Sequence, residues 1–283
     1  MVAEYEIKKF MCEIGKRVYN NGFVAANDGN FSVRISQNEI LTTPTGVSKG
    51  YMTPDMICKV NMKGETIQSS GNYKPSSELK MHIRVYEERP DVKSVVHAHP
   101  PYGTSFAIAG IPLTKQIMPE ATIFLGCIPI AEYGTPSTHE IPDAISKYLQ
   151  NYDAILLENH GALTYGGDLL AAYFKMESLE FYAKLMYRSI MLGGPKELSH
   201  SQVSDLLDLR ERFKVPGKHP GKLCLDNSCS HKEVCASKTG VAKESKCDCK
   251  EKQSVSTEKQ SDSNDMSALV AEITRRVLSE LNK

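Results

Sequence analysis

Three histidines stand in two short motifs that could bind a metal ion. His97 and His99 are two positions apart in a valine-rich run that predicts a strand over residues 94–99. Side chains two positions apart on a strand point to the same face, so both imidazoles can bind one divalent ion. His160 follows a second apolar run, at residues 154–157, and can supply a third ligand. Three histidines with one open position are typical of a catalytic zinc site.

A group of small polar residues could bind an anion. Ser76 and Ser77 begin a helix that the sequence predicts to run towards Pro90, with a serine as N-cap. The N-terminus of a helix offers unpaired N–H groups, and two hydroxyls beside them suit a phosphate. Further donors come from residues of two predicted turns. These residues are Gly29, Asn30, Thr45 and Gly46.

Each motif also has an ordinary structural interpretation. A lone pair of histidines can be a pair of polar residues at the end of a strand. The serines can be plain capping residues, and the other four residues can be plain turn residues. Glu78 can be an acid favoured by the helix dipole. Glu78 gains a chemical role only if the fold brings it near the histidines.

Length and composition favour one folded body followed by a different tail. The chain has 283 residues, with 34 basic and 34 acidic side chains, so no overall field favours nucleic acid or anionic lipid. The first ten residues lack the apolar core of a signal peptide. No apolar run reaches the roughly 18 residues that a membrane span needs. We therefore expect a soluble intracellular protein.

Helical and strand patterns are mixed over residues 1–214. Amphipathic spacing predicts helices over residues 7–18, 168–192 and 199–213. Strands are expected at residues 31–35 and 39–42, besides the two runs that carry the histidines. Because no clean βαβ repeat is present, we predict the α/β class, in layers, with a central sheet flanked by helices.

The tail divides into two parts. Residues 215–265 are rich in Lys, Ser and Cys and poor in large apolar side chains, which predicts a disordered linker. Residues 266–283 predict an amphipathic helix that Ser267 can cap. Its apolar face contains Leu269, Val270, Ile273, Val277, Leu278 and Leu281. A lone helix this short is marginal in water, so the apolar face should dock on something.

The eight cysteines do not suggest a disulfide framework. Cys12, Cys58 and Cys127 are scattered, and we expect isolated reduced thiols there. Five more crowd the linker, at irregular spacings. A second metal site in the linker stays open, although a solvated linker with free thiols fits these spacings better.

The order of the motifs resembles the class II aldolase family, typified by L-fuculose-1-phosphate aldolase, over roughly residues 5–213. The resemblance implies a layered fold with a central sheet, and a fourfold homotetramer with active sites at subunit interfaces. It implies that His97, His99 and His160 are zinc ligands and that Glu78 is the catalytic acid/base. The implied phosphate site consists of Gly29, Asn30, Thr45, Gly46, Ser76 and Ser77.

The implied activity is cleavage of a deoxyketose 1-phosphate. L-fuculose 1-phosphate or L-rhamnulose 1-phosphate would give dihydroxyacetone phosphate and lactaldehyde. Zinc would polarise the carbonyl and stabilise the charge left by bond cleavage, while Glu78 moves the proton. A 4-epimerase or dehydratase on the same metal site is the alternative. Sugar-phosphate epimerases typically carry an aspartate where Glu78 stands, which favours the aldolase. A non-catalytic scaffold is disfavoured because all three histidines are retained.

The chain departs from the family pattern in its tyrosines. Family aldolases use one tyrosine in a middle loop and one in the C-terminal tail. This sequence has none between Tyr102 and Tyr133, and none after Tyr187. Glu120 lies in the matching middle region and is a candidate substitute as proton donor.

The tail lies outside the aldolase resemblance. A flexible linker followed by a short terminal helix resembles the encapsulation peptides of enzymes packaged in bacterial microcompartments. This implies binding to microcompartment shell or cargo proteins, and location in the microcompartment lumen within the cytoplasm. Release of a reactive aldehyde would suit such packaging. The alternative is a helix that packs back on its own tetramer.

Overall fold

A mixed sheet of eight strands forms the middle of the molecule. The computed structural model describes residues 2–221. Its strands are β1 (Asn30–Arg34), β2 (Glu39–Thr42), β3 (Cys58–Asn61), β4 (Thr66–Gln68), β5 (Ser94–Ala98), β6 (Ile130–Ala131), β7 (Ala154–Leu157) and β8 (Gly161–Gly166). Their order in the sheet is β4-β3-β2-β1-β5-β8-β7-β6. Only β6 and β7 pair in parallel; every other pair of neighbours is antiparallel.

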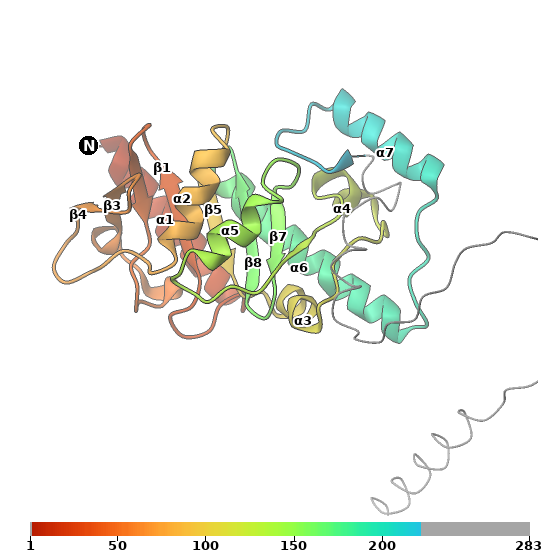
Figure 1. Cartoon of the computed structure of the whole chain (residues 1–283), viewed down its shortest axis with the longest axis horizontal. Coiled ribbons are helices and arrows are strands. Elements are labelled where there is room, and N and C mark those ends of the chain that lie inside the picture. The colour runs from red at the N-terminus through yellow and green to blue at the C-terminus, as the bar shows by residue number, and fades with distance from the viewer. Residues whose placement is uncertain (1, 222–283) are drawn as a thin grey trace, which may run out of the picture. The chain divides into compact units, whose positions relative to one another are not determined.

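Helices cover both faces of this sheet (Figure 1). They are α1 (Val2–Asn20), α2 (Leu79–Glu88), α3 (Pro101–Ala109), α4 (Pro119–Phe124), α5 (Glu140–Ser146), α6 (Leu169–Met191) and α7 (His200–Arg212). Apolar side chains of α1, α3 and α6 share one core with one face of the sheet. Side chains of α2 and α5 share a second core with the opposite face. The predicted α/β class with a central sheet flanked by helices is thereby confirmed.

Strand β5 shows how alternation divides the two cores. Val95 packs into the core under α2 and α5, and Val96 packs into the core under α6. Because side chains alternate along a strand, His97 faces the α2 side together with Val95. The strands at residues 39–42 and 154–157 agree with prediction. Strands β3, β4, β6 and β8 were missed, and Gly161 and Gly166 at the ends of β8 obscured its pattern.

The start of α2 corrects one prediction. The helix begins at Leu79, with Glu78 rather than a serine as N-cap, and no side chain caps it. The chain before it pairs with the turn after β2: Ser76 N–H donates to Thr43 O at 3.2 Å, and Thr45 N–H donates to Lys74 O at 2.9 Å. This pairing holds the serines in an extended turn outside the helix. Their hydroxyls therefore lie before the first helical turn.

The predicted helices over 168–192 and 199–213 are confirmed, and both have side-chain caps. Asp168 accepts the N–H of Ala171 at 2.7 Å at the start of α6. Ser199 and Gln202 form a capping box at the start of α7. No helix within residues 2–221 is long and apolar enough to cross a membrane.

The ordered body continues beyond residue 214. Arg210 donates to the carbonyl oxygens of Pro216 and Gly217 at 3.3 and 3.1 Å. His219 Nε2 donates to Thr122 O at 2.7 Å. These contacts tie residues 215–221, which the sequence placed in the linker, to the folded body. Residues 222–265, the late cysteines and the predicted helix at 266–283 lie outside the described residues.

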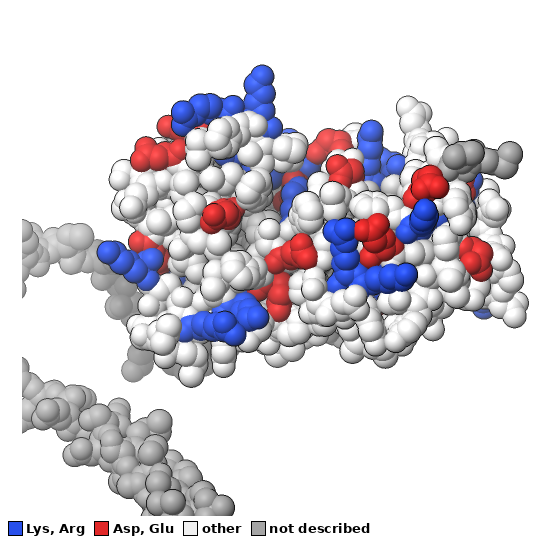
Figure 2. Space-filling model, turned by 180° about the vertical axis from the view of Figure 1, so that it is seen from behind, with Lys and Arg blue, Asp and Glu red and all other residues white. Residues whose placement is uncertain are grey.

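The cysteines of the body are of two kinds. Cys12 and Cys58 are buried and free, as expected. Cys127 is disulfide-bonded, so the expectation of a reduced thiol is wrong there. Charges of both signs are interspersed on the face of the molecule shown in Figure 2, in keeping with the balanced composition.

Candidate metal centre and active site

Sheet pairing brings the predicted site residues together. His97 lies in β5, opposite Asn30 of β1 on one side and opposite Leu163 of β8 on the other. His99 follows the end of β5, and His160 occupies the turn between β7 and β8. Because β8 pairs with β5, this turn lies beside His99. Glu78, at the start of α2, faces the same place.

The three histidines form one compact group. Their ligand nitrogen atoms all lie within 4.8 Å of one another. The ring centroids of His97 and His160 are 4.7 Å apart, and those of His99 and His160 are 5.1 Å apart. The Nε2 atoms of His97 and His99 are only 3.2 Å apart.

The neighbours of the two Nδ1 atoms indicate how His97 and His99 are protonated, and so how their two Nε2 atoms interact. His97 Nδ1 lies 2.9 Å from the carbonyl oxygen of Ala162, which only accepts, so Nδ1 carries the proton. His99 Nδ1 lies 3.4 Å from Asp28 Oδ2, and a proton on this nitrogen would face the carboxylate. Both Nε2 atoms then present lone pairs to each other. Two lone pairs at this distance repel, and a cation bound between them removes the repulsion.

The carboxylate of Glu78 completes the group. Its Oε2 accepts a hydrogen bond from Asn30 Nδ2 at 2.8 Å and lies 3.5 Å from His97 Nε2. Its Oε1 lies 3.3 Å from His160 Nε2. Within the described part of the chain, Glu78 Oε1 and His160 Nδ1 are buried without a hydrogen-bond partner. Unsatisfied buried atoms beside three imidazoles fit a site that binds a divalent metal ion and a substrate.

Burial keeps the imidazoles in the form that binds metal. His97 is fully buried, and this burial, followed by the nearby His160 and His99, holds its pKa well below the usual value. Burial also lowers the pKa of His160, against the opposing effect of Glu78. Neutral imidazole is the ligand form, because a protonated nitrogen has no lone pair to donate.

The site opens into a cleft of about 220 Å³. The predicted phosphate-binding residues Gly29, Asn30, Thr45, Ser76 and Ser77 all line it. Gly46 does not line it; with φ of +73° it forms the turn that follows Thr45. The cleft thus has imidazoles and a carboxylate, with hydroxyl groups facing the same space.

Five residues that line the cleft were not identified as site residues from the sequence: Asn27, Asp28, Pro44, Lys49 and Pro136. Asp28 adjoins the predicted Gly29-Asn30 turn, and that turn was a signal that could have pointed to it. Lys49 Nζ donates to the carbonyl oxygens of Asn27 and Val47, each at 2.7 Å. Burial lowers the pKa of Lys49 to about 8. Nothing in the local sequence marks Lys49 as part of a site.

Two other polar residues lie outside the cleft lining. Glu120 is exposed in α4 and does not line the cleft. His82 is buried, as a structural residue would be, with Nδ1 at 2.7 Å from Ser32 Oγ. Burial lowers the pKa of His82 to about 3. A larger apolar pocket of about 370 Å³, between α6 and residues 215–217, shares no lining residue with the cleft.

The chain matches the family described as Class II Aldolase and Adducin N-terminal domain over residues 9–187. It belongs to this family. With the histidine group and Glu78 in place, it is a class II aldolase-type enzyme, a metal-dependent carbon–carbon lyase.

The chain aligns with nearly the whole length of the relatives and solved structures that it resembles. The chain is 35% identical to an L-fuculose phosphate aldolase of Methanococcus maripaludis over 175 residues, 62% of this chain and 93% of the relative. It is 32% identical to a 3-oxo-tetronate 4-phosphate decarboxylase of Haemophilus influenzae over 205 residues, 70% of this chain and 95% of the relative. The crystal structure of YgbL from Klebsiella pneumoniae matches with a TM-score of 0.66 at 29% identity, covering 72% and 98% of the two chains.

Proposed function

We propose that the enzyme is a zinc-dependent aldolase that cleaves L-fuculose 1-phosphate or L-rhamnulose 1-phosphate to dihydroxyacetone phosphate and lactaldehyde. The observation that carries this proposal is the cleft itself. His99, His160 and Glu78 line the same cleft as Ser76, Ser77 and Thr45, and the buried His97 adjoins the other two histidines. Such a cleft can hold the carbonyl end of a small sugar at a metal and its phosphate among the hydroxyls.

Each residue of the site has a defined role in the proposed reaction. His97, His99 and His160 would hold zinc, which would supply a Lewis acid for the substrate carbonyl. Asn30 holds Oε2 of Glu78, which leaves Oε1 free to exchange a proton with the substrate. Asp28 and the carbonyl of Ala162 fix the ring orientation of His99 and His97. The hydroxyls bind the phosphate and so align the reacting carbon atoms.

A second candidate reaction is decarboxylation of a 3-oxo-acid phosphate. Relatives with the name 3-oxo-tetronate 4-phosphate decarboxylase favour it, as does the absence of tyrosines at the positions that family aldolases use. Loss of carbon dioxide next to a carbonyl leaves the same kind of negative charge as carbon–carbon cleavage, so the same residues could stabilise it. Epimerisation and dehydration are further reactions that this metal site could support.

The test is a substrate panel with zinc-loaded protein, with and without a chelator. The panel contains L-fuculose 1-phosphate, L-rhamnulose 1-phosphate, 5-deoxy-D-ribulose 1-phosphate and 3-oxo-tetronate 4-phosphate. The third compound is included because a 5-deoxy-D-ribulose 1-phosphate aldolase of Bacillus thuringiensis is 30% identical over 195 residues. Chelator-sensitive release of dihydroxyacetone phosphate from fuculose or rhamnulose phosphate supports the aldolase. Carbon dioxide release alone would replace it with the decarboxylase.

We further propose that the enzyme is a homotetramer. Large apolar side chains on α6 stay exposed in the single chain: Phe174, Phe181, Tyr187, Ile190 and Met191. Burial of this stripe against other copies would remove apolar surface from water. Light scattering of the purified protein tests this, and a monomer at micromolar concentration would contradict it.

Residues 1–214 are proposed as the catalytic domain, to which the contacts of residues 215–221 add a short extension. The remaining part of the predicted linker, residues 222–265, would connect this domain to residues 266–283, a helix that binds microcompartment shell or cargo proteins. The enzyme would then work in the microcompartment lumen. Deletion of residues 266–283 should leave activity unchanged and abolish co-purification with shells. Truncated enzyme that still enters shells would refute this role of the tail.

A further inference from the structure

Lys49 is a buried cation beside the catalytic cleft. Its side chain belongs to the 3₁₀ turn Lys49–Tyr51, and the residue is only 1% exposed. Two of its three N–H groups donate to the carbonyl oxygens of Asn27 and Val47. Both acceptors are neutral, and one N–H group remains available for a further acceptor. The carboxylates of Asp28 and Glu78 act on Lys49 electrostatically, but among the described residues neither forms an ion pair with it, so the ammonium can still bind an anionic ligand.

The charges of the cleft are otherwise negative. Its lining includes the carboxylates of Asp28 and Glu78, and Lys49 is the one lysine or arginine among the residues that line it. The predicted phosphate-binding side chains are hydroxyls and an amide, which donate hydrogen bonds but carry no charge. A phosphate dianion in this cleft would face two carboxylates, with only the metal and Lys49 to balance them.

We propose that Lys49 binds the anionic phosphate of the substrate and is the protein's own cation in that subsite. This inference rests on the proposed function, because it assumes a phosphorylated ligand. The two carbonyl bonds hold the ammonium between the loop at Asn27 and the loop at Val47, so its position is fixed before the ligand arrives. An ordered ammonium that needs no rearrangement makes a stronger bond to the phosphate than a flexible one.

A purely structural role for Lys49 makes a different prediction. If Lys49 only ties the two loops together, its loss would disturb every ligand of the cleft, whether charged or neutral. If Lys49 binds phosphate, its loss would weaken the binding of phosphorylated ligands alone. A pair of ligands that differ only in the phosphate separates the two roles.

The experiment compares dihydroxyacetone phosphate with dihydroxyacetone on zinc-loaded full-length enzyme, by titration calorimetry or by inhibition. For Lys49→Met we expect affinity for dihydroxyacetone phosphate to fall about 10- to 100-fold, the range of one charge-assisted hydrogen bond. Inhibition by dihydroxyacetone and the zinc content should stay unchanged. Lys63→Met, which removes an exposed lysine on the same body, is the matched control and should bind both ligands as wild type does.

Lys49→Arg distinguishes loss of the charge from a folding defect. It keeps the positive charge but changes the hydrogen bonds to Asn27 O and Val47 O. We expect Lys49→Arg to bind dihydroxyacetone phosphate more tightly than Lys49→Met. The inference would be overturned if both variants lost the same affinity for dihydroxyacetone phosphate. It would also be overturned if Lys49→Met weakened the binding of dihydroxyacetone phosphate and of dihydroxyacetone equally. Inorganic phosphate, titrated into wild type and Lys49→Met, gives the same comparison without a sugar.

These outcomes are separable from failure of the proposed cleavage, since binding needs no turnover. Enzyme that binds dihydroxyacetone phosphate through Lys49 but cleaves no sugar phosphate would refute the aldolase and keep the inference. Enzyme that cleaves fuculose phosphate, with an unchanged KM in Lys49→Met, would refute the inference and keep the aldolase.

Discussion

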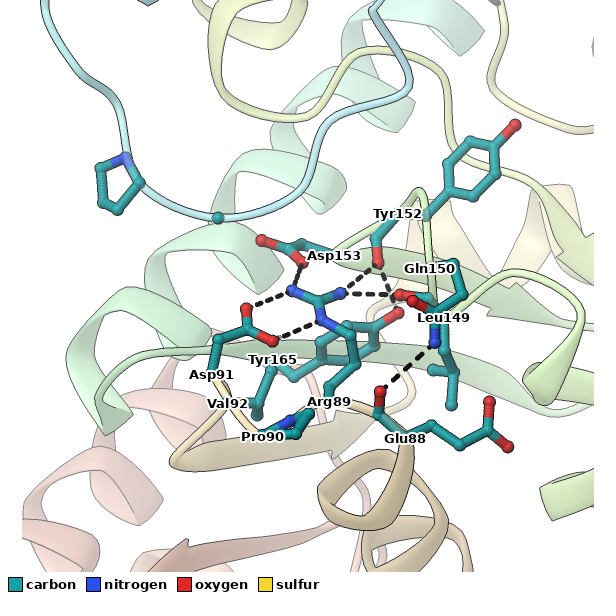
Figure 3. A network of polar contacts seen from close by, with 12 residues as sticks. Glu88, Arg89, Pro90, Asp91, Val92, Leu149, Gln150, Tyr152, Asp153 and Tyr165 are labelled. Atoms are coloured by element: carbon teal, nitrogen blue, oxygen red, sulfur yellow. Dashed lines mark hydrogen bonds and ion pairs between the residues drawn. The ribbon is translucent and has the colours of Figure 1, made fainter.

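Two clusters of charged side chains in this body differ in how completely they are hydrogen-bonded. In the first, Arg89 is buried and donates to Asp91 and Asp153 at 2.7–2.8 Å (Figure 3). It also donates to the carbonyl oxygens of Leu149 and Tyr152 at 2.7 and 3.3 Å. Every guanidinium nitrogen therefore has an acceptor.

The polar side chains around Arg89 also have hydrogen-bond partners. Lys175 donates to the second carboxylate oxygen of Asp153 at 2.6 Å. Tyr165, whose ring lies under the guanidinium, donates its hydroxyl to Tyr152 O at 2.6 Å. The bond from Arg89 also keeps the pKa of Asp91 below its ordinary value. This cluster joins the turn after α2 to the strands, and none of its side-chain atoms is among the described buried atoms that lack a hydrogen-bond partner.

The cleft has the opposite character. Glu78 Oε1, His160 Nδ1 and Asn30 Oδ1 are buried without hydrogen-bond partners among the described residues. A buried polar atom without a partner costs free energy, and a metal ion or substrate bound here could satisfy these three atoms. The contrast indicates that a saturated buried network stabilises the fold, and that an unsaturated one is kept open for chemistry.

Removal of a metal ligand should have the largest effect. In His97→Ala we expect bound zinc to be lost and cleavage to fall to background, because two imidazoles hold the ion too weakly. Metal analysis and dihydroxyacetone phosphate release measure both effects, and chelation of wild type should reproduce them. His200→Ala, an exposed histidine at the start of α7, is the control and should retain zinc and activity.

Replacement of the catalytic carboxylate should come next. Glu78→Gln keeps the shape of the side chain but removes the proton acceptor, so kcat should fall by about 10²- to 10⁴-fold. Zinc content should be that of wild type, since the ligands are untouched. A kcat within tenfold of wild type would refute the role given to Glu78 and weaken the contrast between the two clusters.

A substitution in the fully hydrogen-bonded cluster around Arg89 should lower the stability of the protein rather than its catalytic rate. Arg89→Met leaves Asp153 buried with a weaker set of partners, so unfolding free energy should fall by roughly 3–5 kcal/mol. The kcat of the folded fraction should not change. Denaturant unfolding with Arg84→Met as control tests this, because the partly exposed ion pairs of Arg84 contribute only about 0–1 kcal/mol. A loss of kcat in stable Arg89→Met would show that this network also serves catalysis.

A subtler effect is expected at the support of a ligand. Asp28→Asn weakens the acceptor that fixes the ring of His99, so zinc affinity should fall about tenfold. Competition with a metal indicator gives this affinity directly. Unchanged affinity would mean that the partly exposed Asp28 does not orient the ring.

The smallest effect concerns Glu120. It lies outside the cleft lining of its own chain, so Glu120→Gln can change the rate only if another subunit brings it to the site. We expect a cleavage rate within about twofold of wild type if one chain supplies the whole site, because surface changes away from special features act weakly. A large loss in the purified enzyme would place Glu120 in the active site of a neighbouring subunit.

The local pattern of the sequence determined much about this protein. Valine-rich runs and the two-residue spacing of His97 and His99 predicted both the strand and the shared face, because alternation along a strand is a local property. The helices over 168–192 and 199–213 followed from their periodicity, and Ser199 capped the second as helix starts require. The order of the turn, serine–Glu78 and histidine motifs resembled the class II aldolase family, and the match over residues 9–187 confirmed the family.

Only the tertiary structure decided which of these residues meet. The pairing of β5 with β8 brings His160 beside His97, although the two histidines are 63 positions apart in the sequence. The pairing of residues 74–76 with residues 43–45 moved the serines out of the helix into the cleft wall. The roles of Lys49 and Arg89 also depend on distant segments, because Lys49 donates to Asn27 O and Arg89 donates to Leu149 O, Tyr152 O and Asp153 as well as to acceptors two residues away. Local sequence dictates periodicity and capping, whereas the partner of a buried charge depends on contacts that exist only in the folded chain.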